Sequence, residues 1–343
     1  MKILRNTIIA VCALTASLCA TAQKLTWNLD FETVFDNREG DRKYMRPETY
    51  FFTNLAPEIG LRLNDGNRIA GGVVWNQPIG REWHGYRVSP TLYYRHTSRL
   101  WSLSMGMFPR EQLHEEMPKF MWNDSLTYFQ HNIRGALVQY HGDRAFVDFY
   151  LDWRQMQTER KREAFNVVVH GQWHPRPDGP FFAGAHAMMN HFALTRHAAP
   201  DEHIVDNFMV HPYVGVDLSR RTALDSLQIR LGALITVERD RAVEGWASPV
   251  GAQLEVMARW RWLMLKENLY IGQNQLPSYM RHGPLLYQAE PFYQSKVYNR
   301  TDVIARFYST RYVDLEASLD FNVTRESFIF YQRLTARVYI GSR

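Results

Sequence analysis

Regular alternation of apolar and polar residues dominates this chain. The clearest stretch follows Tyr312, where the apolar positions are Val313, Leu315, Ala317, Leu319 and Phe321. The positions between them are Asp314, Glu316, Ser318, Asp320 and Asn322. The same period of two recurs in 144–154, 226–238, 247–262 and 327–341. A strand directs successive side chains to opposite faces, so this period predicts sheets with two unlike faces.

Sixteen segments carry strand patterns. They are 25–36, 50–63, 67–76, 86–96, 100–108, 130–141, 144–154, 163–173, 181–191, 207–218, 226–238, 247–262, 268–273, 300–308, 311–322 and 327–341. Pro57 interrupts the second of them, and 268–273 is short. No apolar helical stripe of comparable length competes with these patterns, so we expect an all-β protein.

The connections between these segments alternate in length. The short set is 64–66, 97–99, 141–143, 174–180, 219–225, 263–267 and 309–310. The other set is 37–49, 77–85, 109–129, 155–162, 192–206, 239–246, 274–299 and 323–326. Short turns at one end and long loops at the other are typical of outer-membrane barrels. The pattern predicts a transmembrane antiparallel up-and-down β-barrel of about sixteen strands, within about 14–18, and favours it over a secreted β-sandwich.

The N-terminus has the shape of a secretory signal. Lys2 and Arg5 precede an apolar stretch over 7–18, and small residues at 20–22 suit a signal peptidase. We therefore expect a cleaved signal peptide over 1–22, export to the cell outer membrane, and a barrel over 23–343.

Cysteine usage narrows the chemistry of the exported chain. Cys12 and Cys19 are the only cysteines, and both lie in the predicted signal peptide. Lipidation of Cys19 is the alternative to cleavage after Ala22, but Leu18 replaces the small residue that a lipoprotein signal needs. The mature chain then has no thiol, which excludes a cysteine nucleophile and a thiolate metal site.

Charge and composition exclude two further classes. The chain has 40 Lys+Arg against 35 Asp+Glu and no run of five basic residues, so we expect no nucleic-acid partner. A mean hydropathy of −0.38 argues against a bundle of membrane helices. Aromatic residues make up 14% of the chain, and Trp and Tyr near predicted strand ends fit interfacial girdles.

These features resemble the porin-type barrels of Gram-negative outer membranes, in particular those of the Bacteroidetes. The resemblance rests on a signal ending in Ala22-Gln23, on alternating strands rich in tyrosine and arginine, and on the long loop 109–129. One departure is the end of the chain, Val338 to Arg343, where many porins have a terminal aromatic residue used in assembly.

The predicted inward face is rich in charge. Its residues include Asp30, Glu32, Glu58, Asp148, Asp152, Arg154, Arg230, Glu255, Arg306, Asp320, Arg333 and Arg337. Buried ions are costly, so they need water or a dense network of pairs. About sixteen strands leave room for an aqueous channel. We therefore expect outer-membrane lipid and small hydrophilic solutes as partners and passive diffusion as the function, with a plugged, salt-bridged barrel as the alternative.

The resemblance implies a constriction formed by loop 109–129. In general porins the third long loop folds inward, and its acids face basic residues on the wall. The corresponding acids here are Glu111, Glu115, Glu116 and Asp124, and the basic residues are Arg62, Arg68, Arg95 and Arg134. Opposed charges across a narrow passage tune ion selectivity. The alternative is a solvated surface loop.

Candidate catalytic and metal-binding residues are less distinctive. His186, His191, His197 and His203 are close in sequence, but their spacings match neither neighbouring strand positions nor a helix face. We expect no metal site and no cofactor. The chain has no Gly-x-Ser-x-Gly, P-loop or His-Glu-x-x-His motif, so we predict that it is not an enzyme.

Three alternatives stay open at this stage. Aromatic residues in loops and lumen suit a saccharide-specific channel, and the barrel equally suits a structural or secretion-associated role. An outer-membrane hydrolase is a further alternative, with His84, His114, His203 and Asp206 as residues for its loop end. The sequence also leaves open a homo-oligomer, the solute and the pore diameter.

Overall fold

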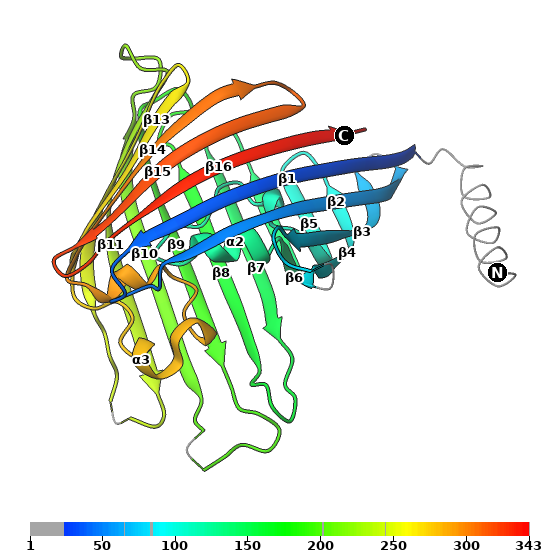
Figure 1. Cartoon of the computed structure of the whole chain (residues 1–343). Helices are drawn as coiled ribbons and strands as arrows, with labels where there is room; N and C mark the ends of the chain where they lie inside the picture. Colours follow the sequence, from blue (N-terminus) through cyan, green and yellow to red (C-terminus); the bar gives the residue numbers. More distant parts are fainter. Residues whose placement is uncertain (1–23, 65, 83–84, 201, 244, 343) are drawn as a thin grey trace, which may run out of the picture.

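The computed structural model describes residues 24–64, 66–82, 85–200, 202–243 and 245–342; the predicted signal peptide, 1–22, lies outside them. Sixteen antiparallel strands form a closed barrel in which each strand pairs with its neighbours in sequence, and β1 pairs with β16 (Figure 1). The predicted fold class is confirmed. No helix in the described part of the chain is long and apolar enough to cross a membrane.

The strands follow the sequence pattern closely. The first eight are β1 (Lys24–Gly40), β2 (Glu48–Asn64), β3 (Asn67–Pro78), β4 (Arg87–Thr97), β5 (Trp101–Pro109), β6 (Asn132–His141), β7 (Ala145–Gln155) and β8 (Ala164–Trp173). The others are β9 (Phe181–Phe192), β10 (Val205–Asp217), β11 (Ser226–Asp240), β12 (Val250–Trp260), β13 (Leu263–Gly272), β14 (Val297–Ser309), β15 (Val313–Thr324) and β16 (Phe328–Gly341). Turns and longer loops alternate around the barrel, so β1 begins and β16 ends at the turn end.

One predicted turn is wrong. The sequence placed a turn over 263–267, whereas β13 begins at Leu263 after the two-residue connection 261–262. Arg261 has φ 56°, the left-handed backbone that tight hairpins use. The sequence pattern missed this part of the strand because Glu267 places a carboxylate on the outward, otherwise apolar face. There the carboxylate accepts a hydrogen bond from Thr301 at 2.6 Å.

The outer surface presents the apolar positions of the alternating pattern. Ile59, Val214 and Leu231 are among the exposed large apolar side chains of the strands. Trp101, Trp173 and Trp260 are exposed at strand ends on the turn side. An apolar band edged by aromatic residues is the surface that a barrel presents to lipid.

The lumen is filled at its loop end. The connections 110–131 and 273–296 fold inward, and the short helix α2 (Asp124–Phe129) lies within the ring of strands (Figure 1). Their buried side chains form what we call the plug core: Met117, Phe120, Met121, Trp122, Leu276, Leu286, Phe292 and Tyr293. Each is at most 6% exposed. An apolar core therefore occupies the lumen at this level.

A network of ion pairs surrounds the plug core. Arg300 of β14 lies 2.9 Å from Asp124, 2.7 Å from Asp302 and 3.4 Å from Asp320. These four residues are at most 4% exposed. We expected either water or a dense network of ion pairs around the inward charges. At the loop end of the barrel, the structure has the network of ion pairs.

The two inward loops are also bonded to each other. The Asn123 backbone amide donates to the Gln288 carbonyl at 2.7 Å, and the Asp124 amide donates to the Glu290 carboxylate at 3.0 Å. The Glu290 amide donates to the Lys119 carbonyl at 2.9 Å. The plug is thus a single packed unit built from two connections.

Candidate functional site

The acids of loop 110–131 pair with arginines other than those predicted. The loop turns inward, as the porin resemblance implies. Glu115 lies 3.0 Å from Arg230 of β11, and Glu111 pairs with Arg337 of β16. Asp124 pairs with Arg300, as described above. Lys266 holds the pKa of Glu116 below its usual range.

The predicted basic residues on the wall do not pair with the loop acids. Arg68 lies 2.7 Å from Glu58 on the neighbouring strand, and Arg62 is exposed near the turn end of β2. Arg95 does reach the loop, but it donates to Gln112 rather than to an acid. The structure therefore does not bring the two predicted sets together, and a role for them at a constriction stays a prediction.

Arg134 lies on the outer face, so its predicted inward orientation is wrong. It is exposed, whereas Ile133 and Leu137 of the same strand are at most 1% exposed and belong to the core cluster of the lumen. The physical reason is the plug: Ile133 and Leu137, at inward positions of β6, pack in the apolar core cluster of the lumen. Polarity therefore does not mark the lumen side of this strand.

A row of residues that includes three polar side chains borders the apolar band on the outer face of β7 to β11. Register pairs Trp153 with Phe165, Phe165 with His191, His191 with Asp206, and Asp206 with Arg239. We call these five residues the outer row. The next outward positions toward the middle of the barrel are Val167, Met189, Phe208 and Val237. The outer row thus lies at the loop-end edge of the lipid-facing band.

The centre of the outer row is a histidine–carboxylate pair. His191 Nδ1 lies 3.2 Å from Asp206 Oδ1, and Arg241 donates to Asp206 Oδ2 at 3.0 Å. The Phe165 ring lies 4.8 Å from the imidazole ring of His191. The side chains of His191 and Asp206 are 24% and 25% exposed. Because Nδ1 contacts the carboxylate, Nε2 is the ring nitrogen that can accept a proton.

This arrangement has the parts of a general base. A carboxylate that holds one imidazole nitrogen orients the ring and stabilises the imidazolium formed when the other nitrogen takes a proton. The flanking arginines, Arg239 and Arg241, carry forked guanidinium groups suited to phosphate. The site therefore combines a base with anion-binding groups at an interface between lipid and water.

Two other hydrogen-bonded histidine–carboxylate pairs among the described residues face the lumen. His114 of loop 110–131 contacts Asp148, which is fully buried. His282 Nε2 lies 2.9 Å from Asp240, which is 6% exposed. Neither carboxylate is on the lipid-facing surface, because Asp148 and Asp240 occupy inward positions of β7 and β11.

The four histidines that are close in sequence do not form one group in the structure. His186 faces the lumen and His191 faces outward, because an odd spacing of five residues reverses the face of a strand. His197 lies in the loop after β9 and pairs with Glu159. Asp206 was among the residues considered for a hydrolase, but its partner is His191 and not His203. The alternation of strand faces could have predicted from the sequence that His186 and His191 lie on opposite faces of one strand.

Solved structures with the same fold are outer-membrane proteins. An anion-selective porin from Comamonas acidovorans is 9% identical, with 93% of this chain and 100% of that chain covered and a TM-score of 0.56. A loop-deletion mutant of OmpT, an outer membrane protein of Vibrio cholerae, is 10% identical, with coverages of 93% and 100% and a TM-score of 0.55. Pseudomonas aeruginosa OccK2 in complex with glucuronate is 7% identical, with coverages of 93% and 99% and a TM-score of 0.54. At these identities the likeness establishes the fold, that of a Gram-negative outer-membrane barrel.

The comparison with curated protein sequences gave no significant match. A family model described as lipid A 3'-O-deacylase-type matches residues 17–335. Deacylation is a hydrolytic reaction, so this match overturns the prediction that the protein is not an enzyme. The matched region runs from before β1 into β16, and the chain belongs to the lipid A 3'-O-deacylase-type family.

Proposed function

We propose that this protein is an outer-membrane hydrolase that removes an ester-linked acyl chain from lipid A, with His191 as its general base. The observation that carries the proposal is the His191–Asp206 pair on the lipid-facing surface of a chain in this family. The long loops of outer-membrane barrels are extracellular. The outer row therefore lies at the level of the outer leaflet, where lipid A places its sugar and ester groups.

The reaction needs only water and the ester. His191 Nε2 accepts a proton from a water molecule, whose oxygen attacks the acyl carbonyl carbon. The tetrahedral intermediate then expels the sugar oxygen, which takes the proton back from the His191 imidazolium. The products are a fatty acid and a sugar hydroxyl. Asp206 stabilises the imidazolium between these steps.

The surroundings of the dyad fit an amphipathic substrate. Arg239 belongs to β11 and Arg241 directly follows that strand, and the exposed Arg134 belongs to β6. Arginine binds phosphate in a bidentate fashion, so these residues suit the phosphates of lipid A. Val167, Met189 and Phe208, one step toward the middle of the barrel, provide an apolar surface for acyl chains.

The alternative function, passive diffusion of small solutes, is supported only by the barrel architecture. The plug core and the Arg300 ion pairs occupy the loop end of the lumen, where a diffusing solute needs water. A saccharide-specific channel requires the same open lumen. The outer row needs no passage through the barrel, so it favours hydrolysis at the outer surface.

The decisive experiment is an assay of the detergent-purified protein with lipid A in mixed micelles. Release of fatty acid and the matching loss of mass from lipid A are measured by mass spectrometry. We expect hydrolysis by the wild type and a loss of about 10²–10⁴-fold in His191→Ala, which is the usual contribution of a general base.

His197→Ala is the matched control, because His197 also pairs with a carboxylate near the loop end but lies away from the outer row. We expect it to retain activity. Intact lipid A after incubation with folded wild-type protein would refute the proposed reaction. Full activity in His191→Ala would refute the role of the dyad while leaving the reaction standing.

A further inference from the structure

Three histidines form a row on the lumen face of the barrel. His170 of β8 pairs in register with His186 of β9, and His186 pairs with His211 of β10. The ring centroids of His170 and His186 are 4.1 Å apart, and those of His186 and His211 are 5.6 Å apart. All three residues are at most 2% exposed. This row is distinct from the outer row, which lies on the opposite face of the same strands.

The buried imidazoles lack hydrogen-bond partners. No partner is found for Nε2 of His170, or for either ring nitrogen of His186 and of His211, within the described part of the chain. Burying a polar atom without a partner costs the free energy of its lost hydration. Native proteins seldom leave such atoms unpaired without a water, an ion or a function to account for them. Five in one row therefore indicate a ligand.

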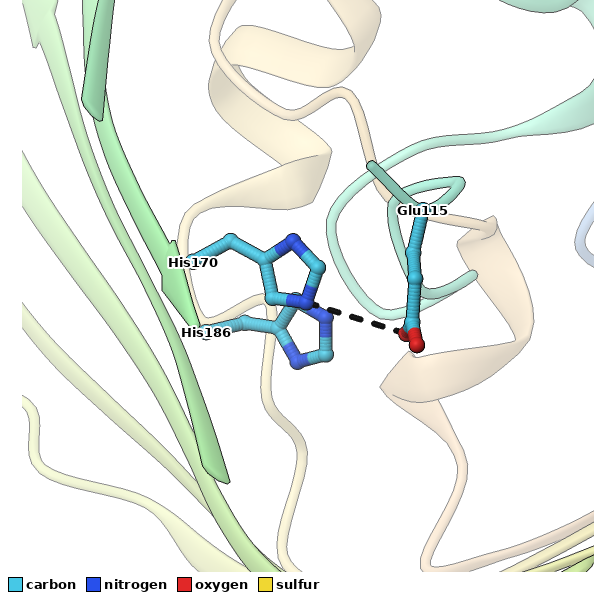
Figure 2. A group of neighbouring side chains, drawn as sticks. All are labelled: Glu115, His170 and His186. Carbon is cyan, nitrogen blue, oxygen red and sulfur yellow. Dashed lines mark ion pairs between the residues drawn. The ribbon is translucent and has the colours of Figure 1, made fainter. Parts of the chain in front are cut away.

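A carboxylate approaches the row from the plug. Glu115 of loop 110–131 lies with its Oε2 3.7 Å from His170 Nε2, too far for a hydrogen bond. Figure 2 shows the His170 ring directed at this carboxylate, with His186 beside it. One ligand atom from each of Glu115, His170 and His186 lies within 4.8 Å of the others. Ligand atoms around a tetrahedral zinc ion are about 3.3 Å apart, so small side-chain rotations close the set.

The groups around the row determine which kind of cation it suits. Arg230 donates to both oxygens of Glu115 at 3.0 and 3.2 Å, which orients the carboxylate and leaves further lone pairs on it. A Cβ at Gly232 would lie 2.4 Å from His211 Nε2, so the glycine makes room for that ring. The positive charge of Arg230 opposes a cation held by electrostatics alone. Imidazole ligands instead favour a transition metal such as zinc over calcium or magnesium.

We propose that Glu115, His170 and His186 bind a divalent transition metal of the zinc class, with His211 within reach as a further ligand. The ligands come from two wall strands and from the inward loop 110–131. The ion would therefore tie loop 110–131 to the wall of the barrel. The site is independent of the hydrolytic dyad and needs no lipid.

The test is metal binding by the full-length barrel, refolded in chelator-treated detergent. Cobalt(II) serves as the spectroscopic probe and zinc as the competitor, with titration calorimetry for stoichiometry. We expect one ion per chain, tetrahedral cobalt absorption, and a rise in the thermal unfolding temperature with zinc. His186→Gln and Glu115→Gln should each weaken binding at least tenfold, while His197→Gln binds as the wild type does.

Heat-dependent mobility on gels confirms that each variant is folded, and Glu115→Gln changes a loop and leaves the strands intact. Absence of binding by the wild type at micromolar metal would overturn the site. Unchanged binding in both variants would do the same. A signal lost in His191→Ala but kept in His186→Gln would assign the metal to the outer row and also refute the site. Because no lipid is used, absence of binding at Glu115, His170 and His186 leaves the proposal of lipid A hydrolysis unaffected.

Discussion

At the residue scale, the proposed chemistry depends on which face of a strand a side chain occupies. His186 and His191 belong to the same strand, β9, yet one faces the lumen and the other faces lipid. Asp206 is placed against His191 by the register of β9 and β10. A single-residue shift of that register would turn the carboxylate into the lumen and separate the pair. The contact between His191 and Asp206 therefore depends directly on the register of β9 and β10.

Asp206→Asn tests the carboxylate at this scale. An amide keeps the shape of the side chain but cannot stabilise the imidazolium that forms on His191. We expect kcat for fatty-acid release to fall by about 10²–10⁴-fold with little change in KM, because the loss is confined to the transition state. Glu202→Gln, on the neighbouring loop, is the control. Equal kcat values for Asp206→Asn and the wild type would show that the carboxylate has no catalytic role.

At the element scale, two loops decide what the lumen contains. Loops 110–131 and 273–296 supply both the plug core and part of the ion-pair network. Burial would raise the pKa of Asp124, but Arg300, Lys119 and Arg333 hold it well below its usual range. Burial and the neighbouring Asp124 raise the pKa of Glu290. The two loop carboxyls therefore act on stability in opposite directions.

The pH dependence follows from these directions. Stability from ionised Asp124 is fully present above its unfolded pKa of about 3.9 and is lost as the pH falls through the lowered folded value. For Glu290 the raised folded pKa favours the protonated form, and that contribution is lost as the pH rises through it. At pH 7 the charge of Asp124 stabilises the plug, whereas ionisation of Glu290 opposes its burial.

Paired amide substitutions test this difference at pH 7. Asp124→Asn leaves the buried Arg300 and the partly exposed Arg333 with less compensation, and we expect a loss of about 3–5 kcal/mol. Glu290→Gln should be close to neutral, because its Oε2 has no hydrogen-bond partner among the described residues. Urea unfolding in lipid vesicles, followed by tryptophan fluorescence, measures both. A larger loss in Glu290→Gln than in Asp124→Asn would contradict this account of the network.

At the scale of the whole molecule, a porin architecture encloses a filled lumen. The closed antiparallel barrel of this chain shares its fold with the solved outer-membrane proteins described above. The plug nevertheless places buried aromatic and charged groups where an aqueous passage would run. The proposed function accordingly uses the outer wall of the barrel and not its interior.

Conductance in planar bilayers distinguishes a channel from a plugged barrel. We expect no stable openings from the wild type, because buried side chains of two inward loops pack together at the loop end of the lumen. Replacing 113–128 by a short Gly-Ser linker removes half of the plug and should produce discrete openings. Stable openings of similar size in both proteins would instead support passive diffusion.

Much of the architecture could be predicted from the sequence, because strand alternation and loop length are local properties. The pattern indicated sixteen strands and their closure, and it failed at 263–267 because one outward carboxylate, Glu267, broke it. Polar side chains marked the lumen correctly at Arg230 and Asp320. They failed at Arg134, since the inward face of β6 packs on an apolar plug.

The barrel could be predicted from local patterns, because a period of two and alternating connection lengths suffice to specify an up-and-down sheet that closes. The pairing of loop acids with arginines and the entry of two loops into the lumen depend on the folded chain. Folding also brings His191 to Asp206 and Glu115 to His170. These contacts join residues 15 and 55 positions apart through strand register and loop insertion. Such contacts leave no local periodicity, because they depend on where distant segments come together in space.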